Sequence, residues 1–262
     1  MNTTRLPALF LSHGSPMLAV QDSPAGRFLD GLGSEVPRPR AIVVASAHFT
    51  AQHPSVGAAA GPATVHDFGG FPQPLYEIQY PAPGSSGLAA DIAVRMAAAG
   101  FQPQERPNHG LDHGVWVPLR RMYPQADVPV VPISVNPHAD ARHHFEVGRA
   151  LAPLRDDGVL VVGSGGFVHN LGDLDWQHPE AQMPAWAREF AEWMRARLAA
   201  HDLPALLDWE QQAPNARRAH PTVEHLMPLF VALGAAGESP AVRTLHRSHE
   251  FGSLALDAFA FD

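Results

Sequence analysis

Three histidines stand where the sequence predicts that buried strands end. His13, His48 and His169 each come shortly after a short apolar run, in a turn that contains Gly or Ser. The runs are residues 6–11, 41–47 and 158–162. Such runs are typical of strands covered on both faces, and ligands of open α/β sheets collect beyond the carboxyl ends of these strands. We therefore expect the three imidazoles to meet at one rim of one sheet, as metal ligands or acid–base groups.

Two more histidines are predicted to stand at the starts of helices. His113 and His225 would lie in the partial positive charge of a helix N-terminus, which favours a neutral imidazole. Thr222 is the predicted N-cap of the second helix. Because neighbouring residues on a helix point about 100° apart, only one of Glu224 and His225 can face the site. His225 shares a stripe with apolar Leu229, so we expect it to face inward and Glu224 to point outward or support it.

Composition excludes several kinds of chemistry. The 262-residue chain has no Cys, so a metal must be held by His, Asp or Glu. All 18 basic residues are Arg, which excludes a Schiff-base lysine, a pyridoxal-phosphate site and a P-loop. The formal net charge of −8 argues against a nucleic-acid partner. The anomaly is the 16 His residues, several of them beside Gly, Asp or Pro.

The pattern of elements predicts a single α/β domain spanning residues 1–262, with a central, mostly parallel or mixed sheet flanked by helices. Neither a linker nor an internal repeat interrupts it. No apolar run is long enough to span a bilayer, and the chain leads straight into a strand rather than a signal peptide. We therefore expect a cytoplasmic protein with no membrane partner, as a monomer or small homo-oligomer.

The remaining elements follow from periodicity and from turn residues. The long stretch 52–84, rich in Pro and Gly, is interpreted as a wall of the site. Residues 253–259 are predicted to form a strand at the edge of the sheet. The other predicted elements are helices at 23–32, 86–99, 138–154 and from His113 to before Pro124, and strands at 128–134 and 241–247. The candidates to shape the pocket are His66, Phe71, Tyr76, Tyr80 and His220.

The glycine-rich turn Gly163–Gly166 invites two other interpretations, and neither fits well. It lacks the spacing of a dinucleotide-binding fingerprint and the acidic residue that should follow about twenty positions on. It is not a nucleophile elbow either, because Val162 stands where that motif needs Gly. Ser15 has no local acid to support it. Serine hydrolysis is therefore a poor explanation of this sequence.

Six motifs, in order and spread over nearly the whole chain, resemble those of the class III (LigB-type) extradiol ring-cleaving dioxygenases, in the 4,5-DOPA extradiol dioxygenase branch. They are Leu11–Pro16, Ser46–His48, His66–Pro72, Leu111–Gly114, Gly163–Leu171 and Pro221–His225. The resemblance implies an α/β domain that opens a catechol ring, such as that of L-DOPA, with O2 at one mononuclear metal. That metal would be Fe(II) natively, with Zn(II) as the alternative.

Carried over position by position, the resemblance makes His13, His48 and His225 the metal ligands. His169 and His113 match the acid–base histidines, and His169 is also a candidate fourth ligand when no substrate is bound. The third ligand is His here, whereas better-known members use Glu. Because an all-His set also suits zinc, a zinc-dependent hydrolase or amidohydrolase with His169 as base is the alternative. A metal-dependent binding or sensor protein without turnover is the third possibility.

Overall fold

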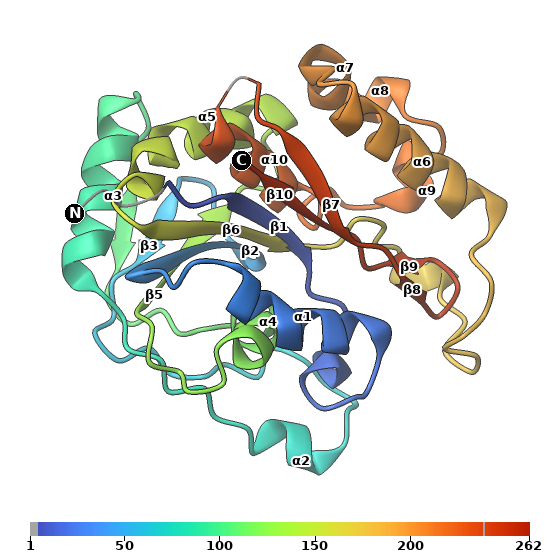
Figure 1. Ribbon diagram of the computed structural model, residues 1–262, viewed down its shortest axis with the longest axis horizontal. Helices are drawn as coiled ribbons and strands as arrows, with labels where there is room; N and C mark the ends of the chain where they lie inside the picture. Colours follow the sequence, from blue (N-terminus) through green and yellow to red (C-terminus); the bar gives the residue numbers. More distant parts are fainter. Residues whose placement is uncertain (1–4, 238) are drawn as a thin grey trace.

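The computed structural model describes residues 5–237 and 239–262, and its centre is one eight-stranded mixed sheet (Figure 1). The strand order is β4-β3-β5-β2-β6-β1-β10-β7, and β8 and β9 form a separate pair. The strands are β1 (Ala8–Ser12), β2 (Ala41–Thr50), β3 (Ser55–Gly57), β4 (Gln104–Arg106), β5 (Val130–Val135), β6 (Val159–Gly165), β7 (Val242–His246), β8 (His249–Glu250), β9 (Leu254–Ala255) and β10 (Ala258–Phe261). The predicted α/β class with a mixed central sheet is confirmed.

The four central strands β5, β2, β6 and β1 run parallel, so their carboxyl ends share one rim. The prediction that the last strand forms an edge is wrong. Strand β10 lies between β1 and β7 and is antiparallel to both, so β7 is the edge. The burial explains this order, because all four residues of β10 are buried while β7 is largely exposed. An apolar strand covered on both faces belongs inside a sheet.

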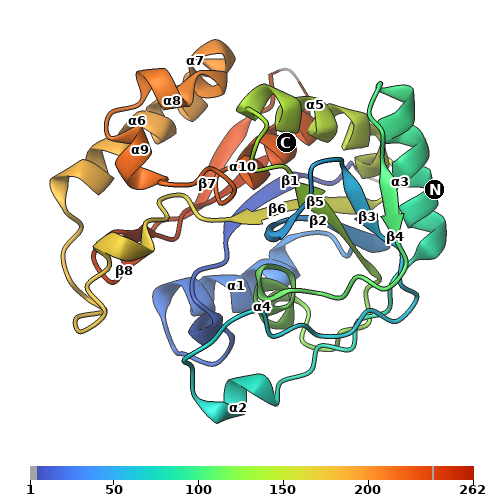
Figure 2. The same ribbon diagram turned by 180° about the vertical axis from the view of Figure 1, so that it is seen from behind.

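Helices cover both faces of the sheet (Figures 1 and 2). Helices α1 and α4 pack on one face against Leu9 and Leu11, while α5 and α10 pack on the other against Ala8 and Phe10. The helices are α1 (Pro24–Glu35), α2 (Gln73–Tyr76), α3 (Ser86–Ala98), α4 (His113–Met122), α5 (Ala141–Leu151), α6 (Ala185–Ala199), α7 (Leu203–Leu207), α8 (Trp209–Gln212), α9 (Ala216–Ala219) and α10 (Met227–Ala236), with 3₁₀ turns η1 (Pro16–Ala19), η2 (Ala152–Arg155) and η3 (Leu171–Asp173).

Most predicted helices lie close to their predicted ranges, but α10 begins later than expected. Ser23 caps α1 by accepting from the amide of Gly26. Thr222 is not the N-cap of α10, since its hydroxyl donates to Glu224 and Leu226 takes the cap position. Among the described residues, no helix is long and apolar enough to cross a membrane.

Arg155 joins distant parts of the core. Its side chain is buried, and it donates to the carbonyls of Leu6 (2.6 Å), Ala235 (3.0 Å) and Phe261 (3.1 Å). These carbonyls lie just before β1, in α10 and at the end of β10. A buried guanidinium that donates to three carbonyls ties the start of β1 and the end of β10, which pair with each other, to helix α10.

Candidate metal centre and substrate cavity

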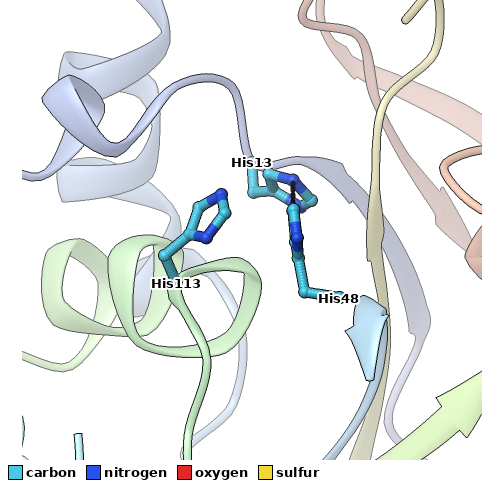
Figure 3. Close-up of side chains that lie close together, drawn as sticks. All are labelled: His13, His48 and His113. Carbon is cyan, nitrogen blue, oxygen red and sulfur yellow. Dashed lines mark hydrogen bonds between the residues drawn. The ribbon is translucent and has the colours of Figure 1, made fainter. Parts of the chain in front are cut away.

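The Nε2 atom of one imidazole, His48, faces those of two others that come from distant parts of the chain. The Nε2 of His48 lies 3.1 Å from that of His13 and 3.3 Å from that of His225. Figure 3 shows the first of these contacts, with His13 entering from the end of β1 and His48 from the end of β2. Rings separated by 35 and 177 positions in sequence therefore meet at the rim where the parallel strands end.

Glycines of β6 allow His225 to reach this rim. A Cβ on Gly165 would lie 2.1 Å from the carbonyl oxygen of His225, a distance that no side chain tolerates. The amide of Gly166 donates to that same carbonyl at 2.8 Å. A Cβ on Gly163 would similarly lie 2.0 Å from the carbonyl oxygen of Pro228 in α10. The glycine-rich turn therefore holds the backbone of the third histidine close to the sheet, and this explains its composition without a phosphate.

The other ring nitrogen of each histidine faces a hydrogen-bond acceptor. His13 Nδ1 lies 3.0 Å from Ser164 Oγ, whose own hydrogen is donated to the carbonyl of Gly114. His225 Nδ1 lies 3.1 Å from Glu224 Oε1, and His48 Nδ1 lies 3.4 Å from a carboxylate oxygen of Asp67. These contacts place the ring hydrogens on Nδ1 and leave Nε2 as a lone pair in all three rings.

This arrangement fits a bound cation. Three Nε2 lone pairs facing one another repel unless a positive ion lies between them. Two nitrogens bound to one metal at about 2.0–2.1 Å lie roughly 3.0–3.4 Å apart, in line with the 3.1 and 3.3 Å found here. Burial lowers the pKa of His48 to about 3, and burial with neighbouring imidazoles holds the pKa values of His13 and His225 well below normal. The rings are therefore neutral near pH 7, as ligands must be.

A second set of three nitrogens is also close enough for one ion. His113, the first residue of α4, places a ring nitrogen within 4.8 Å of those of His13 and His48 (Figure 3). Its ring centroid lies 3.9 Å from that of His48. The cluster thus contains four imidazoles around a common space. In the set of His13, His48 and His113 all ligand atoms lie within 4.8 Å of one another, whereas the Nε2 contacts link His48 to His13 and to His225.

Asp67 links two of these histidines. Its Oδ1 accepts from both the amide (2.9 Å) and Nδ1 (3.0 Å) of His113, and its Oδ2 faces His48 Nδ1. Although burial raises the pKa of Asp67, the hydrogen bonds from His113 outweigh that effect and lower it to about 2. The ionised carboxylate therefore orients one ring on each side. Asp67 lies in the His66–Pro72 motif, but its role could not be predicted from the sequence.

His169 completes the group of five histidines. Its ring stacks on His225 with centroids 3.5 Å apart and planes 5° from parallel. Burial lowers the pKa of His169 to about 4, so its ring is neutral near pH 7. The structure gathers all five predicted site histidines around one space. We call His13, His48, His113, His169 and His225 the histidine floor.

The histidine floor lies in a cavity of about 590 Å³, a size typical of small-molecule sites. Two loops supply its apolar walls. Phe68 and Phe71 come from the loop before α2, which agrees with the predicted role of the 52–84 stretch. Leu171, Leu174 and Trp176 come from the segment after β6. A catechol would have its ring oxygens at the floor and its substituent between the walls.

Phe71 is the one predicted pocket residue that lines the cavity. Tyr80 is buried elsewhere and donates to the carbonyl of Tyr123, and His220 is buried near the carbonyl of Phe167. The ring of His66 lies 3.0 Å from the carbonyl of Ile78. Tyr76 does not line the cavity either, although its hydroxyl lies 3.3 Å from the amide of Phe71.

Residues 7–256 match the family described as the catalytic LigB subunit of aromatic ring-opening dioxygenase. The chain belongs to this family. It is therefore an aromatic ring-opening dioxygenase of a metal-dependent family, and the family's reaction implies a catechol and O2 as reactants. The resemblance noted in the sequence is confirmed over nearly the whole chain.

Curated relatives and a solved structure support the assignment. The chain is 42% identical over 262 residues to a 4,5-DOPA dioxygenase extradiol of Escherichia coli, covering 98% of this chain and 94% of the relative. It is 41% identical over 258 residues to one of Beta vulgaris, covering 96% and 95%. The crystal structure of an uncharacterized protein from Escherichia coli K12 superposes with a TM-score of 0.83 at 35% identity, covering 98% of this chain and all of that one.

Proposed function

We propose that residues 1–262 form one catalytic domain that cleaves a 4-substituted catechol of the L-DOPA type by 4,5-extradiol ring opening. The observation that carries this proposal is the gathering of five histidines on the lining of one cavity, with the Nε2 of His48 facing those of His13 and His225. In the balanced reaction the carbon–carbon bond beside one hydroxyl breaks, and each cleaved carbon receives one atom of O2. The product is a muconic semialdehyde, and the ring supplies all the electrons.

His13, His48 and His225 would hold the metal, which we propose is Fe(II), with Zn(II) as a redox-inactive substitute. When bound, the metal would bring a catechol and O2 together and supply the redox chemistry that couples them. The three rings are locked by Ser164, Asp67 and Glu224 through their Nδ1 atoms. His169 could approach the same ion before substrate binds, since its ring lies against that of His225.

We assign the two remaining floor histidines different proton-transfer roles. His169 is neutral near pH 7, so its lone pair accepts a proton from the catechol hydroxyl. His113 is hydrogen-bonded through Nδ1 to ionised Asp67, which holds its ring at the cavity. That position suits His113 to deliver a proton as the opened ring forms. Replacing either by Gln should lower kcat by about 10²–10⁴ and leave the metal bound.

Anaerobic reconstitution with Fe(II), followed by an oxygen-electrode trace with catechols, tests this proposal. We expect one O2 consumed per catechol and a yellow product. No O2 uptake with any catechol, from protein shown to hold iron, would overturn it. The same measurement distinguishes the proposed dioxygenase from both alternatives, because neither a zinc hydrolase nor a sensor protein takes up O2. Cytoplasmic location and oligomeric state stay predictions of the sequence.

A further inference from the structure

Two large apolar side chains at the mouth of the cavity are exposed to solvent. Leu171 and Trp176 are 53% and 54% exposed, and they belong to a small group of such residues among those described. The other members are Val20, Val65 and Val94. Exposed apolar surface that gathers at a cavity mouth is typical of a ligand contact. An apolar substituent on a bound ligand would therefore cover these two side chains.

The segment that carries them is held in place. The ring of Trp176 packs on Phe251 with centroids 5.2 Å apart. The amide of Asp175 donates to the carbonyl of Phe251 at 3.0 Å, and the amide of Phe251 donates to Pro179 at 2.8 Å. The exposure of Trp176 is therefore a fixed feature of the fold. A preorganised apolar wall binds without the cost of ordering a loop.

The second wall is equally apolar and reaches the floor. Phe68 packs edge-on against the ring of His113, with centroids 5.6 Å apart and planes at 88°. Phe71 packs edge-on against Phe68 at 5.5 Å. A substituent leaving the catechol ring would meet aromatic faces on this side and the Leu171 and Trp176 side chains of the other loop.

Charge is what the lining lacks. Among the described residues that line the cavity, the ionisable groups are the floor histidines and Asp67, with no Arg. Both oxygens of Asp67 face His113 and His48. Arg218 lies outside the lining and is ion-paired with Asp173 at 2.7 Å. A carboxylate on the substituent would find no Arg or other cationic side chain among the described lining residues, so burying it there is costly.

We propose that this site prefers a catechol whose ring substituent is uncharged and apolar, such as a short alkyl chain, over one with an amino-acid side chain. The inference rests on the proposed function and specifies its substrate class. Leu171 and Trp176 are the residues that determine this preference. A pocket that must desolvate an unpaired charge discriminates more strongly than one that merely lacks a methylene.

Binding and turnover are measured separately. Calorimetric titration of zinc-loaded protein with 4-propylcatechol and L-DOPA reports affinity without turnover, and iron-loaded protein gives kcat/KM for both. We expect 4-propylcatechol to bind tighter and to show kcat/KM at least about tenfold above that of L-DOPA. Equal or better binding of L-DOPA to the zinc-loaded protein overturns the preference. If no catechol is cleaved but 4-propylcatechol still binds tighter, the proposed function fails and the preference stands.

Variants locate the preference in the wall. Trp176→Ala should lower affinity for 4-propylcatechol about tenfold more than affinity for unsubstituted catechol. Val94→Ala, which removes a side chain 67% exposed on α3 outside the cavity, is the matched control and should change neither affinity. Thermal unfolding confirms that both variants fold. Equal losses of affinity for the two ligands in Trp176→Ala would show that Trp176 does not contact the ring substituent.

Discussion

The floor and the walls of the cavity are built in opposite ways. The floor histidines lie at or after the ends of core strands, at the start of α4 or just before α10, and four of the five hold a side-chain acceptor through Nδ1. The walls come from two loops, and Leu171 and Trp176 are about half exposed. The position of the proposed metal site therefore depends on the whole core, whereas the choice of substrate depends on a few loop contacts. Changes to the floor should therefore have the larger effects.

The largest effect is expected for the proposed ligands. His225→Ala should weaken Fe(II) binding by more than about 100-fold, beyond what loss of a supporting residue costs. His113→Ala should retain the metal, because its Nδ1 is bonded to Asp67 and its role is proton transfer. Metal content after chelator competition measures both. If His113→Ala loses the metal and His225→Ala keeps it, the ligand set is that of His13, His48 and His113.

Gly165→Ala tests whether the backbone of the floor matters as much as its side chains. The new methyl group would lie 2.1 Å from the carbonyl of His225, so that segment must move. We expect a loss of about 1–3 kcal/mol in unfolding free energy and at least about tenfold weaker metal binding. Gly87→Ala on α3, where a Cβ meets nothing within 4 Å, is the control and should not destabilise. Folded Gly165→Ala with unchanged metal affinity would contradict the role given to the glycine.

Asp67→Asn tests whether the carboxylate that contacts both His113 and His48 orients His48 for metal binding. The amide oxygen can still accept from His113, but the NH2 would then face His48 Nδ1 and move the ring hydrogen to Nε2. We expect metal affinity to fall by about 10–100-fold. Asp175→Asn, at an exposed pair with His178 Nδ1 (2.9 Å), is the matched control and should leave affinity unchanged. Equal affinities for the two variants would show that the carboxylate does not orient His48.

A buried histidine outside the cavity shows what burial alone does. His144 lies within hydrogen-bond distance of the Asp140 carbonyl (2.8 Å) and accepts from the amide of Asn136 (3.0 Å). Burial lowers its pKa to about 4. Since the folded pKa lies below the usual value of 6.5, its contribution to stability is complete above pH 6.5 and is lost as pH falls toward 4. That loss amounts to at most about 3 kcal/mol.

Urea unfolding of metal-free protein at pH 7.5 and 5 measures this contribution. His144→Gln should show a smaller drop in unfolding free energy between the two values than wild type. The same change at exposed His53 is the control and should keep the wild-type drop. An unchanged drop in His144→Gln would mean that the buried ring does not resist protonation.

The smallest effect is expected at the wall. Leu171→Gln replaces a side chain that is 53% exposed and begins the short η3 turn. The unfolding free energy should change by less than about 0.5 kcal/mol, and metal affinity should stay as in wild type. A larger loss of unfolding free energy or of metal affinity would show that the fold and the metal site depend on this wall residue.

Local sequence signals sufficed for the parts of the fold set by local physics. Apolar runs ending in Gly or Ser predicted the rim that carries His13, His48 and His169. Predicted helix starts made His113 and His225 candidates, and the resemblance to the family gave each histidine a role. The place of β10 between β1 and β7 could not be read, because strand pairing joins residues far apart in sequence.

Although the 52–84 stretch was predicted to be a wall, the sequence could not show which of its side chains line the cavity. Tyr80 and Phe71 look alike as loop aromatics, yet one is buried against Tyr123 and the other lines the cavity. Only tertiary contacts separate them. The start of α10 could not be predicted either. The backbone carbonyls of His225 and Pro228 lie against Gly165 and Gly163, and such tertiary contacts are not part of a local helix-capping rule.

The pairing of β1 has a consequence for biosynthesis. The strand at residues 8–12 leaves the ribosome long before residues 258–261, which cover one of its flanks. Until then the nascent chain exposes an unpaired apolar edge, and Arg155 lacks its partner carbonyl at Phe261. A chain that stalls before residue 258 is therefore prone to aggregate through that edge.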